Sequence, residues 1–177
     1  DLIVLGNHKR NFLAEVLGIN TALRVQHRVD IPLLAISKPA ARAYASLLFV
    51  SDLSEEAARA GQHALRLFPG TQLTILHATE SLHTGTLYVG GASVEVRDEY
   101  RRRAQVEAMG RLQAFARDAS LSGALRVELA PPTVVTQRIA RNLGVDLVVL
   151  RPTRLWLTSG VAYYLAADPP CDLLLMP

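Results

Sequence analysis

Two apolar stretches of the sequence each end in residues whose side chains could bind a small polar ligand. Ser51 and Asp52 follow the stretch 45–50, and His77 stands near the end of the stretch 73–78. A hydroxyl, a carboxylate and an imidazole form hydrogen bonds, and the last two also transfer protons. If both stretches are parallel strands, their carboxyl ends meet at one edge of a sheet, where ligands bind in open α/β sheets. We therefore expect a cleft beside Asp52 and His77.

Both residues also have an ordinary structural explanation. Asp52 can be a turn and cap residue between a strand and a helix, and His77 can be a hydrogen-bonded residue at the rim of the core. The sequence leaves these interpretations open. It contains no nucleophile-elbow sequence, no HExxH or paired Cys/His spacing and no Walker A motif. We therefore expect no catalytic residues, no metal site and no enzyme activity.

A second set of candidates follows a stretch that occurs twice. Asp1–Leu5 reads DLIVL and Asp146–Leu150 reads DLVVL, and each precedes a loop, a helix-like segment and a second apolar stretch. A strand, a crossover helix and a parallel strand form a βαβ unit. The loops hold the remaining candidate ligand-binding residues, which are Gly6, His8, Gly18, Asn20 and Thr21 in the first copy and Arg151, Ser159 and Gly160 in the second.

Apolar runs and helical periodicity alternate through the rest of the chain. The patterns predict strands at 45–50, 73–78, 125–129, 146–150 and 171–176, with helices between them. Ser54 should cap the first helix and Thr133 a later one. The long helix 94–119 should turn one face to the core, made of Tyr100, Ala104, Ala108, Leu112, Phe115 and Ala119. This alternation predicts an α/β fold with a doubly wound, mostly parallel five-stranded sheet.

The repeat also predicts how the chain is organised. Residues 44–177 contain a full set of alternating elements, 38–43 form a linker with a proline, and 1–37 hold only a strand, a helix and a strand. We expect residues 1–37 to be the end of a first domain, either in a longer chain or completed by another chain. The last strand is apolar, so it should pair with residues 31–36 or with a second copy rather than remain an open edge.

The composition sets limits on partners and location. The 177 residues are 50% hydrophobic and 20% charged, with a net charge of only +3. Arg101, Arg102 and Arg103 occupy consecutive helix positions and so form no single basic stripe, which argues against nucleic acid as a partner. Cys171 is the only cysteine, and no signal peptide or apolar run of about 20 residues is present. We expect a cytoplasmic protein that makes no membrane contact.

The order and spacing of these motifs resemble the universal stress protein family. The matching segments are Val50–Glu56, Leu73–Ala78, Asp146–Leu150 and the terminal apolar strand, with Asp1–His8 and Asp30–Leu34 in the first copy. The resemblance covers nearly the whole chain. It implies a Rossmann-like sheet with strand order 3-2-1-4-5 and tandem domains that pair through their last strands. It also implies a place for Asp52 near an adenine or ribose.

The resemblance sets an expectation for the two loops as well. Nucleotide-binding members of the family carry Gly-x-x-Gly, nine residues and then Gly-Ser or Gly-Thr, because glycines let backbone N–H groups approach phosphate. Here Lys9 stands at the second glycine of the first copy, and Arg151 and Arg154 replace both leading glycines of the second. An arginine can hold phosphate by its charge, but the backbone cradle is missing. We expect no cofactor, or only weak binding of ATP or AMP.

Three hypotheses follow. The leading one is a non-catalytic universal stress protein domain that acts in stress response through partner binding and pairing of its last strand, as a homodimer or between tandem domains. The second is a universal stress switch of the same fold that binds ATP or AMP. The third is a small-molecule enzyme that uses the cleft near Asp52 and His77.

Overall fold

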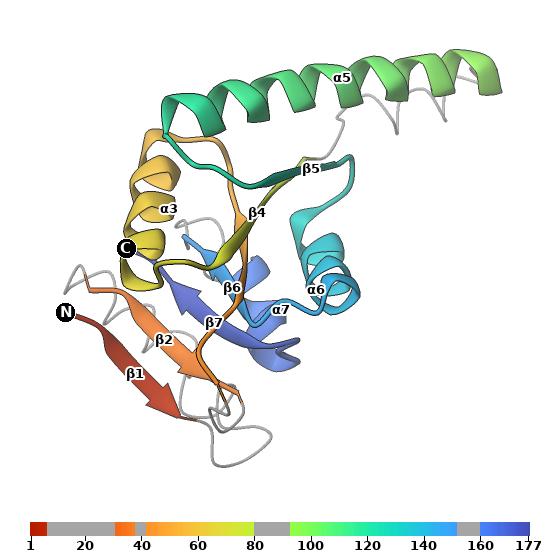
Figure 1. Cartoon of the computed structure of the whole chain (residues 1–177). Helices are drawn as coiled ribbons and strands as arrows, with labels where there is room; N and C mark the ends of the chain where they lie inside the picture. The colour runs from red at the N-terminus through yellow and green to blue at the C-terminus, as the bar shows by residue number, and fades with distance from the viewer. Residues whose placement is uncertain (7–30, 38–41, 80–92, 152–159) are drawn as a thin grey trace.

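The computed structural model describes residues 1–6, 31–37, 42–79, 93–151 and 160–177. These residues form one sheet with helices on both of its faces (Figure 1). The strands are β1 (Ile3–Gly6), β2 (Leu33–Ile36), β3 (Ser46–Val50), β4 (Gln72–Ala78), β5 (Ala124–Glu128), β6 (Leu147–Leu150) and β7 (Asp172–Leu175). The helices are α3 (Glu55–Leu67), α5 (Val94–Asp118), α6 (Pro132–Leu143) and α7 (Val161–Ala167).

The predicted α/β class is confirmed, and the sheet is larger than predicted. Among the described residues it has seven strands in the order β1-β2-β7-β6-β3-β4-β5. The five strands that follow residue 44 have the predicted order 3-2-1-4-5 when they are counted from β3. β2 and β1 extend this sheet beyond β7. The pair of β2 and β7 is antiparallel, and all other neighbouring pairs are parallel.

Alternate residues of the strands form two separate cores. Leu47 and Phe49 of β3 belong to a cluster with α3 and α5, whereas Leu48 and Val50 belong to a cluster with α6 and α7. Figure 1 shows the two helix pairs on opposite faces of the sheet. Because strands buried on both faces need apolar side chains at every position, these segments appear in the sequence as continuous apolar runs.

The helix starts are only partly as predicted. Ser54 caps α3, since its hydroxyl oxygen accepts a hydrogen bond from the N–H of Ala57 at 3.1 Å. The cap at Thr133 is wrong, because α6 begins one residue earlier and Pro131 occupies the N-cap position. Pro132 in the first turn has no N–H group, so one donor that a cap would satisfy is missing there.

Helix α5 contacts the core over only part of its length. Ala108, Leu112 and Ala116 are buried, but Val106 is 73% exposed and the residues at the start of the helix are mostly exposed. Figure 1 shows the first half of α5 extending beyond the edge strand β5. The predicted inner face of α5 is therefore correct only for its second half, because no sheet lies beneath the first.

Asp146 joins the amino ends of two neighbouring strands, β3 and β6. Its carboxylate accepts hydrogen bonds from the N–H groups of Ala45 and Ser46 at 2.8 and 3.0 Å, and from the Arg42 guanidinium at 2.9 Å. The hydrogen bond from the Ala45 N–H is the main cause that holds the pKa of Asp146 below its usual value, and Arg42 and Ser46 add to it. The charged carboxylate therefore stabilises the folded state.

Asp172 at the start of β7 ties together the two chain segments on either side of the predicted linker. Its carboxylate accepts hydrogen bonds from the N–H of Ser37 at 2.7 Å and from the hydroxyl of Tyr44 at 2.6 Å. Burial, followed by the hydrogen bond and the charge of Asp172, raises the pKa of Tyr44 far above its ordinary value. This contact fixes the end of β2 beside the start of β7.

Replacing Asp146 with Asn should make stability less sensitive to acid. A carboxyl whose folded pKa is lowered stabilises the protein above its unfolded pKa, and this contribution disappears as the pH falls through the folded value. We expect Asp146→Asn to be less stable than the natural sequence at pH 7, with the difference shrinking below about pH 4. Urea unfolding at pH 7, 5 and 3 measures this. The exposed Asp98→Asn is the control, and a difference for Asp146→Asn that is constant from pH 7 to 3 would contradict the expectation.

Candidate ligand-binding site at the carboxyl edge of the sheet

The carboxyl ends of β3 and β6 meet where the winding of the sheet reverses. The helix after β3 lies on one face of the sheet, and the helix after β6 lies on the other. Open α/β sheets bind ligands at this switch point, because the crossover connections diverge and leave a crevice. Ser51, Asp52, His77, Arg151 and Gly160 lie at or near this edge of the sheet.

Ser51 and His77 are both buried, at 3% and 8% exposure, and they are bonded to each other. The Nδ1 atom of His77 lies 3.0 Å from the backbone oxygen of Ser51. A carbonyl oxygen only accepts hydrogen bonds, so Nδ1 carries the proton. The N–H of Ser51 in turn donates to the oxygen of Leu76 at 2.9 Å, and its hydroxyl oxygen accepts from the N–H of Leu53 at 3.0 Å. These hydrogen bonds hold the carboxyl ends of β3 and β4 together.

Asp52 is exposed, and its carboxylate is engaged in the turn that leads into α3. It accepts hydrogen bonds from the N–H of Ser54 at 3.0 Å and from the hydroxyl of Ser54 at 2.7 Å. Ser54 is also the cap of α3. Leu53, between them, has a φ angle of 66°, a left-handed conformation that is unusual for leucine. The carboxylate thus supports a tight turn and is not hydrogen-bonded to His77.

Arg151 follows β6, where the family pattern would have a glycine. Its Nε atom donates a hydrogen bond to the backbone oxygen of Pro177 at 3.2 Å, and the residue is half-buried. It borders a hollow of about 290 Å³ together with Glu56, Arg59 and His63 of α3. A cationic guanidinium at this place can attract an anion, but it cannot reproduce a cradle of backbone N–H groups.

Gly6 and Arg151, which open the two repeated loops, lie at opposite edges of the sheet. This follows because β1 is parallel to β2 and β2 is antiparallel to β7. Gly160 is the N-cap residue of the short helix α7. His8, Gly18, Asn20, Thr21 and Ser159 lie outside the described residues, so their predicted roles stay predictions.

The described part of the chain shows no assembled reaction centre. Asp52 and His77 each bond to a neighbouring backbone or cap group rather than to one another. No group of three or more His, Cys, Asp and Glu side chains among these residues is placed to hold a metal ion.

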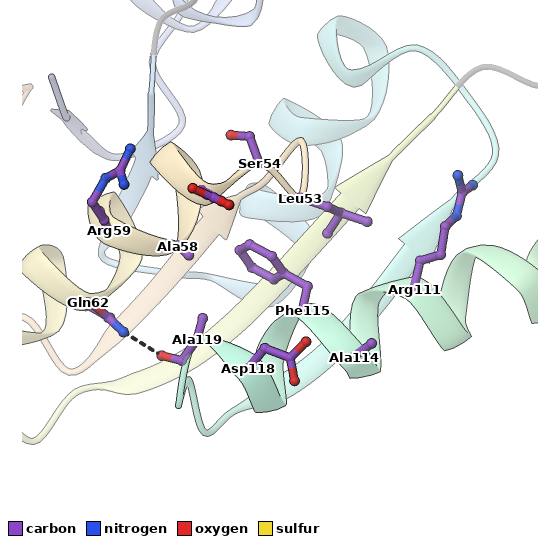
Figure 2. Close-up of a pocket in the computed structure, with 11 residues that line it drawn as sticks. Leu53, Ser54, Ala58, Arg59, Gln62, Arg111, Ala114, Phe115, Asp118 and Ala119 are labelled. Atoms are coloured by element: carbon purple, nitrogen blue, oxygen red, sulfur yellow. Dashed lines mark hydrogen bonds between the residues drawn. The ribbon is translucent and has the colours of Figure 1, made fainter.

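A larger hollow lies elsewhere and was not predicted. It has a volume of about 650 Å³ and runs between α3 and α5, with Leu53 and Phe115 among its lining residues (Figure 2). Its walls come from segments about sixty positions apart, so only the packing of two helices on one face creates it. The sequence contains no pattern that indicates such a hollow.

The strand order and the switch point define a Rossmann-like α/β domain. The model of the universal stress protein family matches residues 43–177, and the chain belongs to this family. No match was found among curated proteins.

Solved structures show the same fold at low sequence identity. A putative universal stress protein from Pseudomonas aeruginosa UCBPP-PA14 is 17% identical, with a TM-score of 0.65 over 99% of this chain and 62% of its own. One from Archaeoglobus fulgidus DSM 4304 is 16% identical, with a TM-score of 0.61 over 99% of this chain and 60% of its own. The chain thus spans about three fifths of both. A universal stress protein described as a complex with cAMP is 18% identical, with a TM-score of 0.52 over 76% of this chain and 98% of its own.

None of the helices that the structure describes is long and apolar enough to cross a membrane. α5 has 25 residues, but charged side chains recur along its length.

Removing the Asp52 carboxylate should cost stability, because its two hydrogen bonds support the turn before α3. We expect Asp52→Ala to lower the free energy of unfolding by about 1 kcal/mol, and Ser54→Ala to have a similar effect. The double variant should lose less than the sum, because both changes break one network. Urea unfolding measures this, with Asp118→Ala at an exposed helix position as control. A neutral Asp52→Ala would show that the turn does not need the carboxylate.

Proposed function

We propose that the chain is a non-catalytic universal stress protein domain that acts in stress response by assembly and partner binding. Its nucleotide site is degenerate. The observation that carries the proposal is that the sheet continues through β2 to β1, an apolar strand with no further neighbour among the described residues. The family membership supports the stress-response part, and it supports a cytoplasmic location together with the single cysteine.

The polar groups at the switch point support a degenerate nucleotide site. The Asp52 carboxylate and the His77 ring are both engaged with their own turn and strand end. Arg151 replaces the leading glycine and donates to the oxygen of Pro177. A nucleotide would have to displace these hydrogen bonds and would gain no glycine cradle in return.

A second candidate function is a nucleotide-responsive switch of the same fold. One observation favours it: a universal stress protein with this fold is described as a complex with cAMP. In this chain the Arg151 guanidinium could contribute charge to such a ligand. An enzyme that uses the cleft near Asp52 and His77 is the third candidate, and it receives no support from the hydrogen bonds of these two residues.

Calorimetry with ATP, AMP and cAMP separates the first two functions. We expect dissociation constants of about 1 mM or weaker, equivalent to about −4 kcal/mol, for all three. Mass spectrometry of gently purified protein should find no stoichiometric adenine nucleotide. A micromolar constant for any of the three would favour the switch and overturn the degenerate site.

The two ends of the sheet differ in how well they resist a new strand. β5 carries Arg126 and Glu128, and charged residues on an edge strand oppose further pairing. β1 has the sequence IVLG, and its Val4 is 52% exposed. Among the described residues β1 pairs only with β2. We therefore place the assembly surface at β1, where β1 of a second copy or the preceding part of a first universal stress domain would continue the sheet.

A proline in β1 should block this assembly without unfolding the strand. The N–H of Ile3 donates to Pro32 on the β2 side, and N–H groups alternate along a strand, so the N–H of Val4 points away from β2. We expect the chain to self-associate in sedimentation equilibrium, and Val4→Pro to shift it to the 19.3 kDa monomer.

Leu5→Pro is the matched control. The N–H of Leu5 faces β2, so the loss of this N–H should lower the midpoint of unfolding. The midpoint of Val4→Pro, measured at low concentration, should stay close to that of the natural sequence. A chain that is monomeric at every concentration, or a Val4→Pro variant that associates as before, would overturn the assembly proposal.

A further inference from the structure

The groove between α3 and α5 has the dimensions of a small-molecule site. Its volume of about 650 Å³ lies in the range of about 300–1,000 Å³ that is usual for ligand pockets. It is separate from the carboxyl-edge hollow that Arg151 borders, since the two share only Arg59. The groove is therefore a candidate site distinct from the proposed assembly surface at β1 and from the carboxyl edge.

The centre of the groove is apolar because small residues face large ones. Figure 2 shows Leu53 and Phe115 extending into the space between the two helices, with Ala58 on α3 and Ala114 on α5. Leu53, Ala58 and Phe115 are partly buried against the core cluster of this face. Two alanines at these positions leave open the space that longer side chains would fill, and so create an apolar surface for a flat ligand.

Leu53 forms one wall of the groove in a strained backbone conformation. Its φ angle of 66° is unfavourable for a residue with a side chain, and a glycine would avoid this strain. Strained residues of this kind occur at ligand clamps, where the surrounding structure holds them in place. Here two hydrogen bonds fix the conformation, from the N–H of Leu53 to the hydroxyl oxygen of Ser51 and from the N–H of Ser54 to the carboxylate of Asp52.

One end of the groove favours an anion. Four charged residues line the groove. Arg59 lies 3.5 Å from Glu56, and Asp118 lies 3.7 Å from Arg117. Glu55 lies in the first turn of α3, where the helix dipole stabilises its carboxylate. Arg111, on α5, has no side-chain hydrogen bond or ion pair with any residue that the structure describes. A guanidinium beside an apolar surface can form paired hydrogen bonds to a carboxylate or sulfonate.

We propose that the groove binds a small aromatic organic acid. Its rings lie on Leu53, Ala58 and Phe115, and its carboxylate or sulfonate contacts Arg111. This ligand site is independent of the proposed function at β1 and of any nucleotide at the carboxyl edge.

Two fluorescent probes that differ in charge test the proposal on the full chain. 1-Anilinonaphthalene-8-sulfonate carries one sulfonate, and N-phenyl-1-naphthylamine has nearly the same rings without it. We expect the sulfonate to bind saturably at one site per chain and more tightly than the neutral probe. Arg111→Gln should weaken the sulfonate about tenfold and leave the neutral probe unchanged, because it removes only a charged hydrogen-bond donor.

Matched variants decide whether the probe occupies this groove. Ala114→Trp should abolish binding of both probes by filling the groove, and Leu53→Gly should weaken both while it suits the left-handed φ. Arg101→Gln, at an exposed position of the same helix, should change neither constant by more than about twofold. Binding that does not saturate, or that survives both Arg111→Gln and Ala114→Trp, overturns the proposal. A change in sedimentation mass with Ala114→Trp, without any effect on the probes, would assign the groove to an interface instead.

Discussion

The antiparallel pairing of β2 with β7 joins the two repeated parts of this chain into one sheet. The register places Leu34 opposite Leu174, and both belong to the core under α3 and α5. Leu33 and Leu175 are likewise opposite one another in the core under α6 and α7. Both cores therefore run without interruption from the complete domain into β2. The Asp172 carboxylate holds the junction at one end by accepting hydrogen bonds from Ser37 and Tyr44.

The same pairing also sets the direction of β1, the strand beyond β2. Because β2 reverses the sheet, the carboxyl end of β1 lies at the edge where the strands β3 to β7 begin. Gly6 and Arg151 consequently lie at opposite edges of the sheet. The reversal also moves the open edge of the sheet from β7, an apolar strand buried along its whole length, to β1. An apolar edge is a place where another strand can add, which is why the proposed assembly surface lies at β1.

The turn 51–54 connects three features of the domain that are separate in the sequence. Its first residue accepts from the ring of His77, its Asp52 carboxylate supports the cap of α3, and its strained Leu53 lines the groove between α3 and α5. A change in this turn would therefore reach both the carboxyl edge and the groove. Hydrogen bonds within four residues hold the turn. The turn borders both the carboxyl edge of the sheet and the groove between α3 and α5.

The sequence by itself determined the α/β class and the cap at Ser54, because apolar runs and capping residues act locally. The order of the five strands after residue 44 came only from the resemblance to the universal stress protein family. The sequence also singled out Asp52 and His77, but it could not say which hydrogen bonds they make. Only the tertiary structure decided that Asp52 supports a turn, that half of α5 leaves the core, and that α3 and α5 enclose a groove. The Asp52 bonds are local, but several side chains and water compete for a carboxylate, so the sequence does not say which partner it takes. The extent of α5 over the sheet and the groove depend on how segments distant in the chain pack, such as those that carry Leu53 and Phe115, and this packing leaves no periodic signal in the sequence.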